Sequence, residues 1–506
     1  MTMLKKLQQM RSHNTDTETQ GLDDETLLRF AKKDSKLEAA VDAAHARFLT
    51  LCEQEPELMA LSEKDLAVAL QEGFTNFYPV NAINPYVALA ASGPWIVTSH
   101  GAVVYECGGY GMLGFGHAPS QVLDAMNQPH VMANIMTPSF SQKRFMDALR
   151  KEIGHTRSEC PYASFFCLNS GSEAVTLGAR ITDINARLMT DPGGKHEGKS
   201  IRILALAQAF HGRTDRPARF SDSCHAVYSK YLASYRDFDN LLTVAPNSIE
   251  QLEQMYEYAN TNNIFIEAFF IEPVMGEGSP GMAITPEFYQ RARELTLEHG
   301  SMFLVDSIQA GIRATGVLSI CDYPGFEKLD APDLETYSKA LNGGQFPLSV
   351  LAVTSSAAEL YRAGIYGNTM TTNPRCLDIA VSVLNSLTPE LRQNIKDRGI
   401  EFLEKLTALK DELSGAITDV KGTGLLVSAE LDPLRFKSYG GNSTEEFMRM
   451  NGVNVIHGGK NALRYTPPFN ITSEEIDVVI AATRDAIVNG PAKVIEAEVE
   501  ENSFAA

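Results

Sequence analysis

The sequence predicts an α/β protein in which helices flank a mostly parallel sheet and a smaller α+β domain follows. Between about residues 100 and 355, short apolar runs alternate with stretches of helical periodicity. These runs show little polar alternation, which is typical of strands buried on both faces. They are ASFFCL, IRILALA, IFIEAFFIEPV, SMFLVD and LSVLAVT. After about residue 375, a long helical stretch leads to GLLVSAEL and NALRY, which predict the smaller domain.

Helical periodicity also dominates the chain from about residue 24 to residue 72, as in LEAAVDAAHARFLTLC. Asp23 and Ser62 precede two of these stretches and are expected N-caps. We therefore expect a helical N-terminal extension over residues 1–75, serving packing or dimer contacts. The leading segment MTMLKKLQQMRSHNT lacks the apolar core of a secretory signal. An organellar presequence and a frayed helix end both remain open for it, and the frayed end is the simpler interpretation.

The composition excludes several classes of protein. The chain has 506 residues, of which 44% are apolar, so two domains are the default expectation. Its 44 Lys and Arg against 63 Asp and Glu give a net charge of −19, which argues against nucleic acid as a partner. No apolar run approaches the length of a membrane span. Seven cysteines without a CxxC pair predict reduced thiols in the cytoplasm, and neither disulfides nor a metal site.

Polar segments follow several of the predicted strands, where ligands bind in open α/β sheets. The first segment, NSGSEA, begins at Asn169 and opens a helix. Small residues such as Ser170, Gly171 and Ser172 leave backbone N–H groups at a helix N-terminus free to bind a phosphate. The same residues also serve as ordinary helix caps, so this segment alone leaves both interpretations open.

The second segment, AFHGRT, follows the strand IRILALA. Phe210 is placed to stack on a flat ring, and Arg213 is able to bind a carboxylate through its two-pronged guanidinium. His211 alone has no predicted catalytic role, because a single histidine is more often a packing residue.

The third and fourth segments carry a carboxylate and a lysine. Asp306 ends the strand SMFLVD, and a buried carboxylate there requires a partner. A pyridinium N–H would be one, and a helix cap or a buried salt bridge would be the alternatives. Lys339 lies in SKALNGG, where small residues allow close approach to a ligand. A lysine in such a site can act as a Schiff-base amine and then as a proton carrier.

These motifs, taken in order, resemble those of class III aminotransferases of pyridoxal phosphate (PLP) fold type I. The resemblance runs from GGYGMLGFGHAP, at residue 108, to LRYTPPFNIT, at residue 463. It rests on the motifs NSGSEA, AFHGRT, IEPVMGEG, VDSIQAG, SKALNGG, NTMTTNP and LRYTPP. With it we expect a large PLP-binding domain over residues 116–365 and a small domain in two parts, residues 76–115 and 366–506.

The resemblance implies a role for each matched residue. Lys339 matches the Schiff-base lysine and Asp306 the partner of the pyridine nitrogen. Thr369 matches a threonine that reaches the phosphate from the neighbouring subunit, which implies a homodimer with shared active sites. The other implied cofactor contacts are the phosphate-binding turn (Ser170, Gly171 and Ser172), the stacking aromatic with its neighbour (Phe210 and His211) and the residue beside the phenolic oxygen (Gln309).

Four further matches bear on the substrates. Glu277 and Arg464 resemble a Glu–Arg pair found in family members that use both an amine and glutamate. In those members the arginine receives the α-carboxylate of glutamate, and it pairs with the Glu when the other substrate binds. Arg213 matches a position for the distal carboxylate, and Tyr110 matches an aromatic in the same pocket. A structural ion pair and a core tyrosine are the alternatives at these positions.

The chain also departs from the family pattern. Ser307 stands where the family commonly has Glu, and Met275 stands where Gln is common. The usual Gly-Arg appears as Arg313-Ala314, so the arginine is offset by one place. Thr371-Thr372 replaces the usual Gly-Gly. These departures indicate a divergent branch and weaken any transfer of substrate identity.

The predicted function is PLP-dependent transfer of an amino group between an amine or ω-amino acid and a keto acid, with glutamate and 2-oxoglutarate as the expected pair. Other PLP chemistry on the same fold, such as aminomutation, racemisation or decarboxylation, is the alternative. A second alternative is a binding protein that has the PLP fold but no catalytic activity. The amine substrate and the preferred acceptor do not follow from the sequence.

Overall fold

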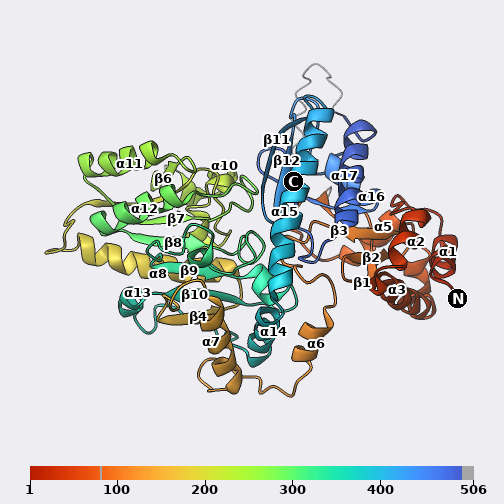
Figure 1. Ribbon diagram of the computed structural model, residues 1–506, viewed down its shortest axis with the longest axis horizontal. Helices are drawn as coiled ribbons and strands as arrows, with labels where there is room; N and C mark the ends of the chain where they lie inside the picture. Colours follow the sequence, from red (N-terminus) through yellow and green to blue (C-terminus); the bar gives the residue numbers. More distant parts are fainter. Residues whose placement is uncertain (80–81, 237, 493–506) are drawn as a thin grey trace.

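The computed structural model describes residues 1–79, 82–236 and 238–492, and Figure 1 shows their arrangement. A seven-stranded sheet lies at the centre of the larger part, in the order β4-β10-β9-β8-β7-β5-β6. In that order its strands are β4 (Ser164–Leu168), β10 (Ser349–Val353), β9 (Leu334–Tyr337), β8 (Met302–Asp306), β7 (Ile264–Ile271), β5 (Ser200–Leu206) and β6 (Leu241–Val244). The predicted α/β class with a parallel-dominated sheet is therefore confirmed.

One strand of this sheet runs against the others. β10, the predicted run LSVLAVT, is antiparallel to both β9 and β4. The segment between β9 and β10 holds only the 3₁₀ helix η5 (Lys339–Asn342). A parallel connection needs a longer crossover, usually a full helix, so a connection this short reverses the chain direction.

Helices cover both faces of the large sheet. Helix α8 (Gly171–Thr190) and helix α13 (Ser355–Leu360) pack on one face, and helix α11 (Ile249–Thr261) and helix α12 (Pro286–His299) pack on the other. All eight residues of β7 are buried. Consecutive β7 side chains enter opposite cores, since Phe269 packs with the α12 side and Phe270 with the α8 side. This burial on both faces explains why the strand sequences are continuously apolar.

Two four-stranded sheets make up much of the rest. One is antiparallel, in the order β11 (Ile417–Thr423), β12 (Leu426–Leu431), β15 (Ala462–Tyr465), β14 (Ile456–Gly458). The other has the order β1 (Ala88–Ser92), β2 (Trp95–Thr98), β3 (Val103–Glu106), β13 (Val453–Asn454). β13 pairs in parallel with β3, so segments far apart in the sequence share one sheet. The helices of this part are α15 (Pro389–Glu412), α16 (Thr444–Met450) and α17 (Ser473–Val488).

Three helices gather at the lower end of the molecule in Figure 1, where α14 (Pro374–Asn385) packs against α6 (Ser120–Met126) and α7 (Phe140–Glu152). Short elements fill the connections elsewhere. They are α9 (Asp215–Ala218), η2 (Asp222–Cys224), α10 (His225–Tyr231), η3 (Ala233–Tyr235) and η4 (Ile320–Asp322). Within the described ranges, no helix is both long and apolar enough to cross a membrane.

The N-terminal extension is helical and firmly docked. Its helices are α1 (Met3–His13), α2 (Asp24–Ala31), α3 (Ser35–Gln54), α4 (Pro56–Met59) and α5 (Glu63–Gln71). Asp23 and Ser62 accept cap hydrogen bonds as expected. The expectation of a frayed first helix is wrong, because α1 buries Met3, Leu7 and Met10 in the core that it shares with α3. α3 packs on β1 and β2, and Trp95 Nε1 donates a 2.7 Å hydrogen bond to Asp34.

Candidate active site

A cavity of about 520 Å³ lies at the carboxyl ends of the central strands and is closed on one side by β14 and β15. This is the edge where an open α/β sheet binds its ligands. Every predicted site residue except Thr369 lines it. These residues are Tyr110, Ser170, Gly171, Ser172, Phe210, His211, Arg213, Glu277, Asp306, Gln309, Lys339 and Arg464.

One end of the cavity is formed by the N-terminus of α8. Ser170 caps this helix by accepting the amide of Glu173, and Glu173 accepts the amide of Ser170 in return. The amides of Gly171 and Ser172 stand in the first turn, where no helical carbonyl precedes them. A Cβ at Gly212 would lie 2.2 Å from Ser172 Oγ, so the glycine keeps the two loops in contact. The turn therefore combines capping with free N–H donors that suit a phosphate.

Asp306 is buried at the end of β8 and is held by three donors. Its Oδ2 lies 2.9 Å from His211 Nδ1, and its Oδ1 accepts bonds from Thr336 Oγ1 at 2.9 Å and from the Ile308 amide at 3.2 Å. A carboxylate has about four acceptor directions, so one remains for a ligand. His211 is thus the partner of Asp306, a role that the sequence did not indicate. Thr336 was also missed, because nothing in its local sequence distinguishes it from a strand residue.

Lys339 is strained and faces Gln309. Its φ is 47°, in the left-handed region that side chains other than glycine seldom adopt. Its Nζ donates a hydrogen bond to Gln309 Oε1. Removal from water, followed by the charge of Arg464, lowers the pKa of Lys339 to about 8. Gln309 Nε2 is buried and has no partner in the described chain, so it is a donor available to a ligand oxygen.

A second buried carboxylate, Glu272, lies beside this group and was not predicted. It accepts the amide of Phe210 at 3.0 Å and the amide of Gly276 at 2.8 Å. It thereby ties the loop after β5 to the loop after β7. Burial raises the pKa of Glu272 to about 7, and the charge of Asp306 acts in the same direction. Its only signal in the sequence is an acidic residue directly after the fully apolar end of β7.

The ion pair at the substrate end differs from the one expected. Glu277 Oε1 lies 3.5 Å from Arg213 Nη2, and within the described residues no salt bridge joins Glu277 to Arg464. Arg464 is buried and donates to the carbonyl of Gly276. Burial lowers the pKa of Arg464, and Glu277 opposes that shift. Arg213 also lies over the Phe210 ring, 5.3 Å from its centroid. The carboxylate therefore stands among two arginines and is paired with the more exposed one.

Two of the predicted residues lie near the rim or outside the cavity. Tyr110 is 36% exposed, and its ring centroid is 6.3 Å from that of Tyr78, which also lines the cavity. Thr369 lies on a separate loop, where its carbonyl accepts a 3.1 Å bond from Asn134 Nδ2. A single chain therefore does not bring Thr369 to the cavity.

Comparison with known proteins agrees with this geometry. The sequence model of the aminotransferase class-III family matches residues 77–487, so the chain belongs to that family. The N-terminal helices precede the matched region. The enzyme is accordingly a PLP-dependent transaminase, and the expected family, activity class and cofactor are confirmed.

Solved structures show the same fold at low sequence identity. Ornithine aminotransferase from Toxoplasma gondii ME49 is 22% identical with a TM-score of 0.70, and the match covers 86% of this chain and 97% of that one. Acetylornithine aminotransferase from Elizabethkingia anophelis is 20% identical with a TM-score of 0.66, covering 84% and 99%. A transaminase from the marine bacterium Virgibacillus is 18% identical with a TM-score of 0.67, covering 83% and 97%.

The cavity suits PLP in its donor set. The free amides at the α8 N-terminus fit the phosphate, the remaining acceptor direction of Asp306 fits the ring nitrogen, and the unpartnered Nε2 of Gln309 fits the phenolic oxygen. The amine of Lys339 is close enough to contact Gln309 and so lies on the same side of the cavity.

Proposed function

We propose that the enzyme transfers an amino group between an amine or ω-amino acid and 2-oxoglutarate, with L-glutamate as the second amino acid. The observation that carries this proposal is the group of two arginines and one carboxylate, Arg213, Arg464 and Glu277, in the cavity that holds Lys339. Two guanidiniums suit the two carboxylates of glutamate. A carboxylate between them allows the same pocket to accept a substrate with fewer negative charges.

The protein residues divide the catalytic work. Bound PLP supplies an aldehyde that takes up the amino group and a ring that withdraws electrons. Lys339 Nζ is the amine that would hold the cofactor covalently, and the free amine would move a proton from the amino-bearing carbon of the substrate. With a pKa of about 8, a useful fraction of Lys339 is neutral near pH 7. Asp306, which contacts His211, would keep a proton on the ring nitrogen.

At the substrate end, the 3.5 Å ion pair of Glu277 with Arg213 must open when glutamate binds. Arg464 then receives the α-carboxylate, and Arg213 receives the distal carboxylate. When an amine without a carboxylate occupies the pocket, Glu277 neutralises an arginine that would otherwise be buried without a partner.

The test is the visible spectrum of the purified holoenzyme before and after addition of L-glutamate. We expect a Schiff-base band that glutamate converts to a pyridoxamine-type band. Lys339→Ala should lack the first band, and Arg464→Ala should keep it while requiring at least about 10-fold more glutamate, since a charge-assisted pair is lost. Arg202→Ala, in an ion pair on β5, is the matched control. A band that glutamate leaves unchanged would overturn the proposal and favour other PLP chemistry.

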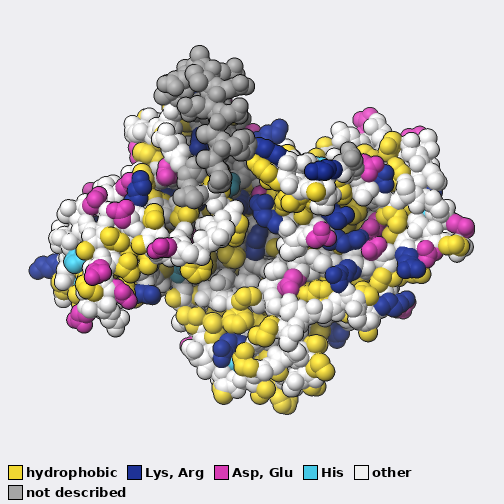
Figure 2. Space-filling model, turned by 180° about the vertical axis from the view of Figure 1, so that it is seen from behind, with side chains coloured by type: hydrophobic (Ala, Val, Ile, Leu, Met, Phe, Trp, Pro, Cys, Tyr) yellow, Lys and Arg dark blue, Asp and Glu magenta, His cyan; other side chains and the backbone are white. Residues whose placement is uncertain are grey.

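We further propose a homodimer in which Thr369 serves the active site of the neighbouring subunit. Supporting this, apolar side chains are exposed around α7 and the preceding loop, and Met136 is 86% and Phe140 84% exposed. The others are Val131, Met132, Ile135 and Met370. Figure 2 shows apolar side chains gathered at the lower end of the molecule, where Figure 1 draws α6 and α7. A patch of this kind marks an interaction surface.

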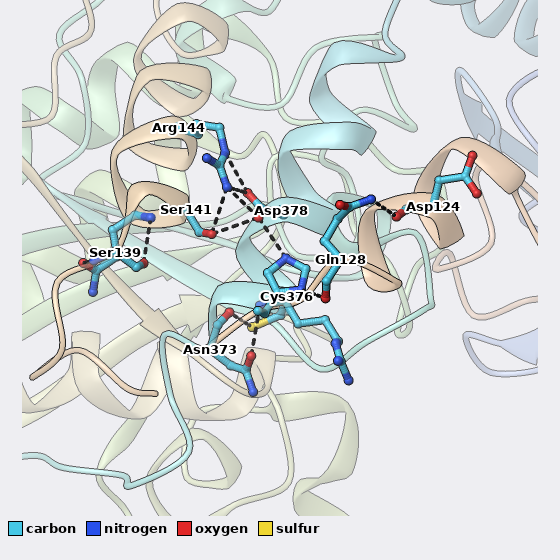
Figure 3. A network of polar contacts seen from close by, with 11 residues as sticks. Asp124, Gln128, Ser139, Ser141, Arg144, Asn373, Cys376 and Asp378 are labelled. Atoms are coloured by element: carbon cyan, nitrogen blue, oxygen red, sulfur yellow. Dashed lines mark hydrogen bonds and ion pairs between the residues drawn. The ribbon is translucent and has the colours of Figure 1, made fainter. Parts of the chain in front are cut away.

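Asp378 holds the loop that carries this patch (Figure 3). It accepts two hydrogen bonds from Arg144 Nη2 and one from Ser141 Oγ at 2.8 Å, both on α7. His130 Nε2 lies 2.9 Å from the same carboxylate, and Asn134, four residues on, holds the Thr369 carbonyl. The network therefore presents Thr369 and the apolar side chains on one ordered surface.

A mixing experiment tests the shared site. Thr369→Ala and Lys339→Ala subunits are each expected to be impaired, but a hybrid dimer regains one complete site. An equal mixture in which half of the dimers are hybrids should therefore recover about a quarter of the wild-type activity. No recovery after verified subunit exchange would contradict the sharing of Thr369.

We also propose a cytoplasmic location, with small-molecule substrates and neither nucleic acid nor membrane as partners. All seven cysteines are free, which suits a reducing compartment. Fractionation of the source cells, with a cytoplasmic marker, is the direct test.

A further inference from the structure

His457, on β14, lines the cavity, and the predictions gave it no role. Its ring is fixed from two sides. The Tyr439 ring lies against the His457 ring at a tilt of 37°, with ring centroids 3.7 Å apart, and His457 Nδ1 lies 3.2 Å from Glu445 Oε2. Glu445, on α16, is 2% exposed. A ring held by both an aromatic contact and a hydrogen bond presents a defined edge to the cavity.

The charge of Glu445 is already balanced. Arg449, one helical turn further along α16, forms a buried ion pair with Glu445 and donates through Nε to the carbonyl of Val455. An ionised carboxylate only accepts hydrogen bonds, so Nδ1 of His457 is the donor. A neutral imidazole has one donor and one acceptor nitrogen, so with Nδ1 donating to Glu445, Nε2 is the acceptor. Among the described residues, Nε2 has no hydrogen-bond partner.

This acceptor complements the other polar groups of the cavity. Arg213 and Arg464 are donors only, and Glu277 is occupied by its ion pair with Arg213. Tyr78 and Tyr110 add aromatic surface to the same cavity, and aromatic faces attract cations. His457 is therefore a neutral acceptor that the cavity offers to a hydrogen-bond donor.

We propose that His457 Nε2 accepts a hydrogen bond from the far end of the amine substrate, so that the enzyme prefers amines whose distal end carries an ammonium or a hydroxyl group. This inference rests on the proposed transamination and names a specificity-determining residue for it. His457 contacts the substrate, Tyr439 and Glu445 position it, and Arg449 pairs with Glu445.

The experiment uses three amines with the same five-carbon chain, namely pentylamine, cadaverine and aminopentanol, in single-turnover reactions of the PLP holoenzyme. The quantity measured is the ratio of kcat/KM for each donor-bearing amine to that for pentylamine, which cancels general losses of activity. We expect a ratio of about 10 or more in the wild type, as one hydrogen bond to a defined acceptor provides. The cadaverine and aminopentanol arms separate an ammonium from a hydroxyl preference.

Variants locate the effect. His457→Phe keeps a ring for Tyr439 and removes Nε2, so the ratio should fall to about 1. His457→Gln supplies an amide oxygen and should retain part of the preference. Tyr439→Phe keeps the ring that contacts His457 and should leave the ratio near that of the wild type. A wild-type ratio near 1, or a ratio unchanged in His457→Phe, overturns the inference. If neither L-glutamate nor any amine converts the cofactor band, the proposed function itself fails.

Discussion

Ser307 Oγ donates a 2.6 Å hydrogen bond to Glu335 Oε1. Ser307 follows Asp306 at a position where related enzymes commonly carry a glutamate. Glu335 lies on the neighbouring strand β9, fully buried, and also accepts bonds from four other donors. These donors are Tyr162 OH, Ser319 Oγ, the Ile320 amide and Tyr337 OH. The buried carboxylate next to position 307 therefore comes from Glu335 on the adjacent strand. A serine suits position 307 because its hydroxyl donates to that carboxylate.

This arrangement predicts strong coupling between positions 307 and 335. Ser307→Glu sets a second carboxylate against Glu335 and should lower the free energy of unfolding by about 3 kcal/mol. Glu335→Gln alone should cost about 1–3 kcal/mol, because one acceptor oxygen is lost among five donors. The loss of unfolding free energy in the double variant should be smaller than the sum of the losses in the two single variants. Urea denaturation of all four proteins measures the coupling, and additive losses would contradict it.

The depressed pKa of Lys339 predicts the pH dependence of cofactor recombination. Only the neutral amine reacts with the aldehyde of PLP. The rate at which apoenzyme regains its Schiff-base band should therefore rise with pH and level off above a midpoint of about 8. A rate that continues to rise toward pH 10 would show an ordinary lysine. The α-amine of a model peptide, measured in the same buffers, controls for the chemistry of PLP itself.

The contact between His211 and Asp306 predicts a cofactor-binding effect. His211→Phe removes one donor to the carboxylate and should weaken PLP binding about 10-fold. Asp306→Asn should lower kcat about 100-fold or more, since the charge opposite the ring nitrogen is lost. Thr336→Val, which removes the other side-chain donor to Asp306, is the matched comparison for His211→Phe. Titration of apoenzyme with PLP gives the affinities, and wild-type affinity in His211→Phe would exclude this role.

Thr372 predicts a stabilising substitution. It replaces a glycine usual in related enzymes, and its φ of 60° lies in the left-handed region, where a β-branched side chain is strained. Thr372→Gly should raise the free energy of unfolding by about 1 kcal/mol through relief of that strain. Thr371, the preceding residue, does not have a positive φ, so Thr371→Gly should instead destabilise the protein. Thermal melting of both variants tests this prediction, and equal changes in their melting temperatures would contradict it.

The raised pKa of Glu272 predicts a pH-dependent stability. A carboxyl whose pKa is about 7 in the folded apoenzyme and 4.5 when unfolded binds its proton more tightly in the folded state. Its contribution is therefore complete below pH 4.5 and is lost as pH rises through 7. Between pH 5 and pH 8 the wild type should lose about 2 kcal/mol relative to Glu272→Gln. Parallel urea titrations at the two pH values measure this difference, and a constant difference would contradict it.

Much of the cavity followed from the sequence because its residues occupy motifs at strand ends. Asp306 and Lys339 needed only the strand assignment and the resemblance. The direction of β10 did not follow from the sequence, because a continuously apolar strand has the same pattern in a parallel and in an antiparallel position. His457 and Tyr78 were missed for a different reason. They come from segments far apart in the chain, and neither carries a local pattern that marks a ligand contact. The pairing of Glu277 with Arg213 likewise depends on packing around Arg464.

The docking of the N-terminal extension has a consequence for how the chain folds. The amide of Gln20 donates to the carbonyl of Met450, and β3 pairs with β13, which begins at Val453. The segment that carries Gln20 therefore completes this contact only after residue 450 has been synthesised. Contacts of such long sequence separation form slowly. Until β13 arrives, the edge of β3 that pairs with it is open, and this is the interval in which the nascent chain is most open to misassembly.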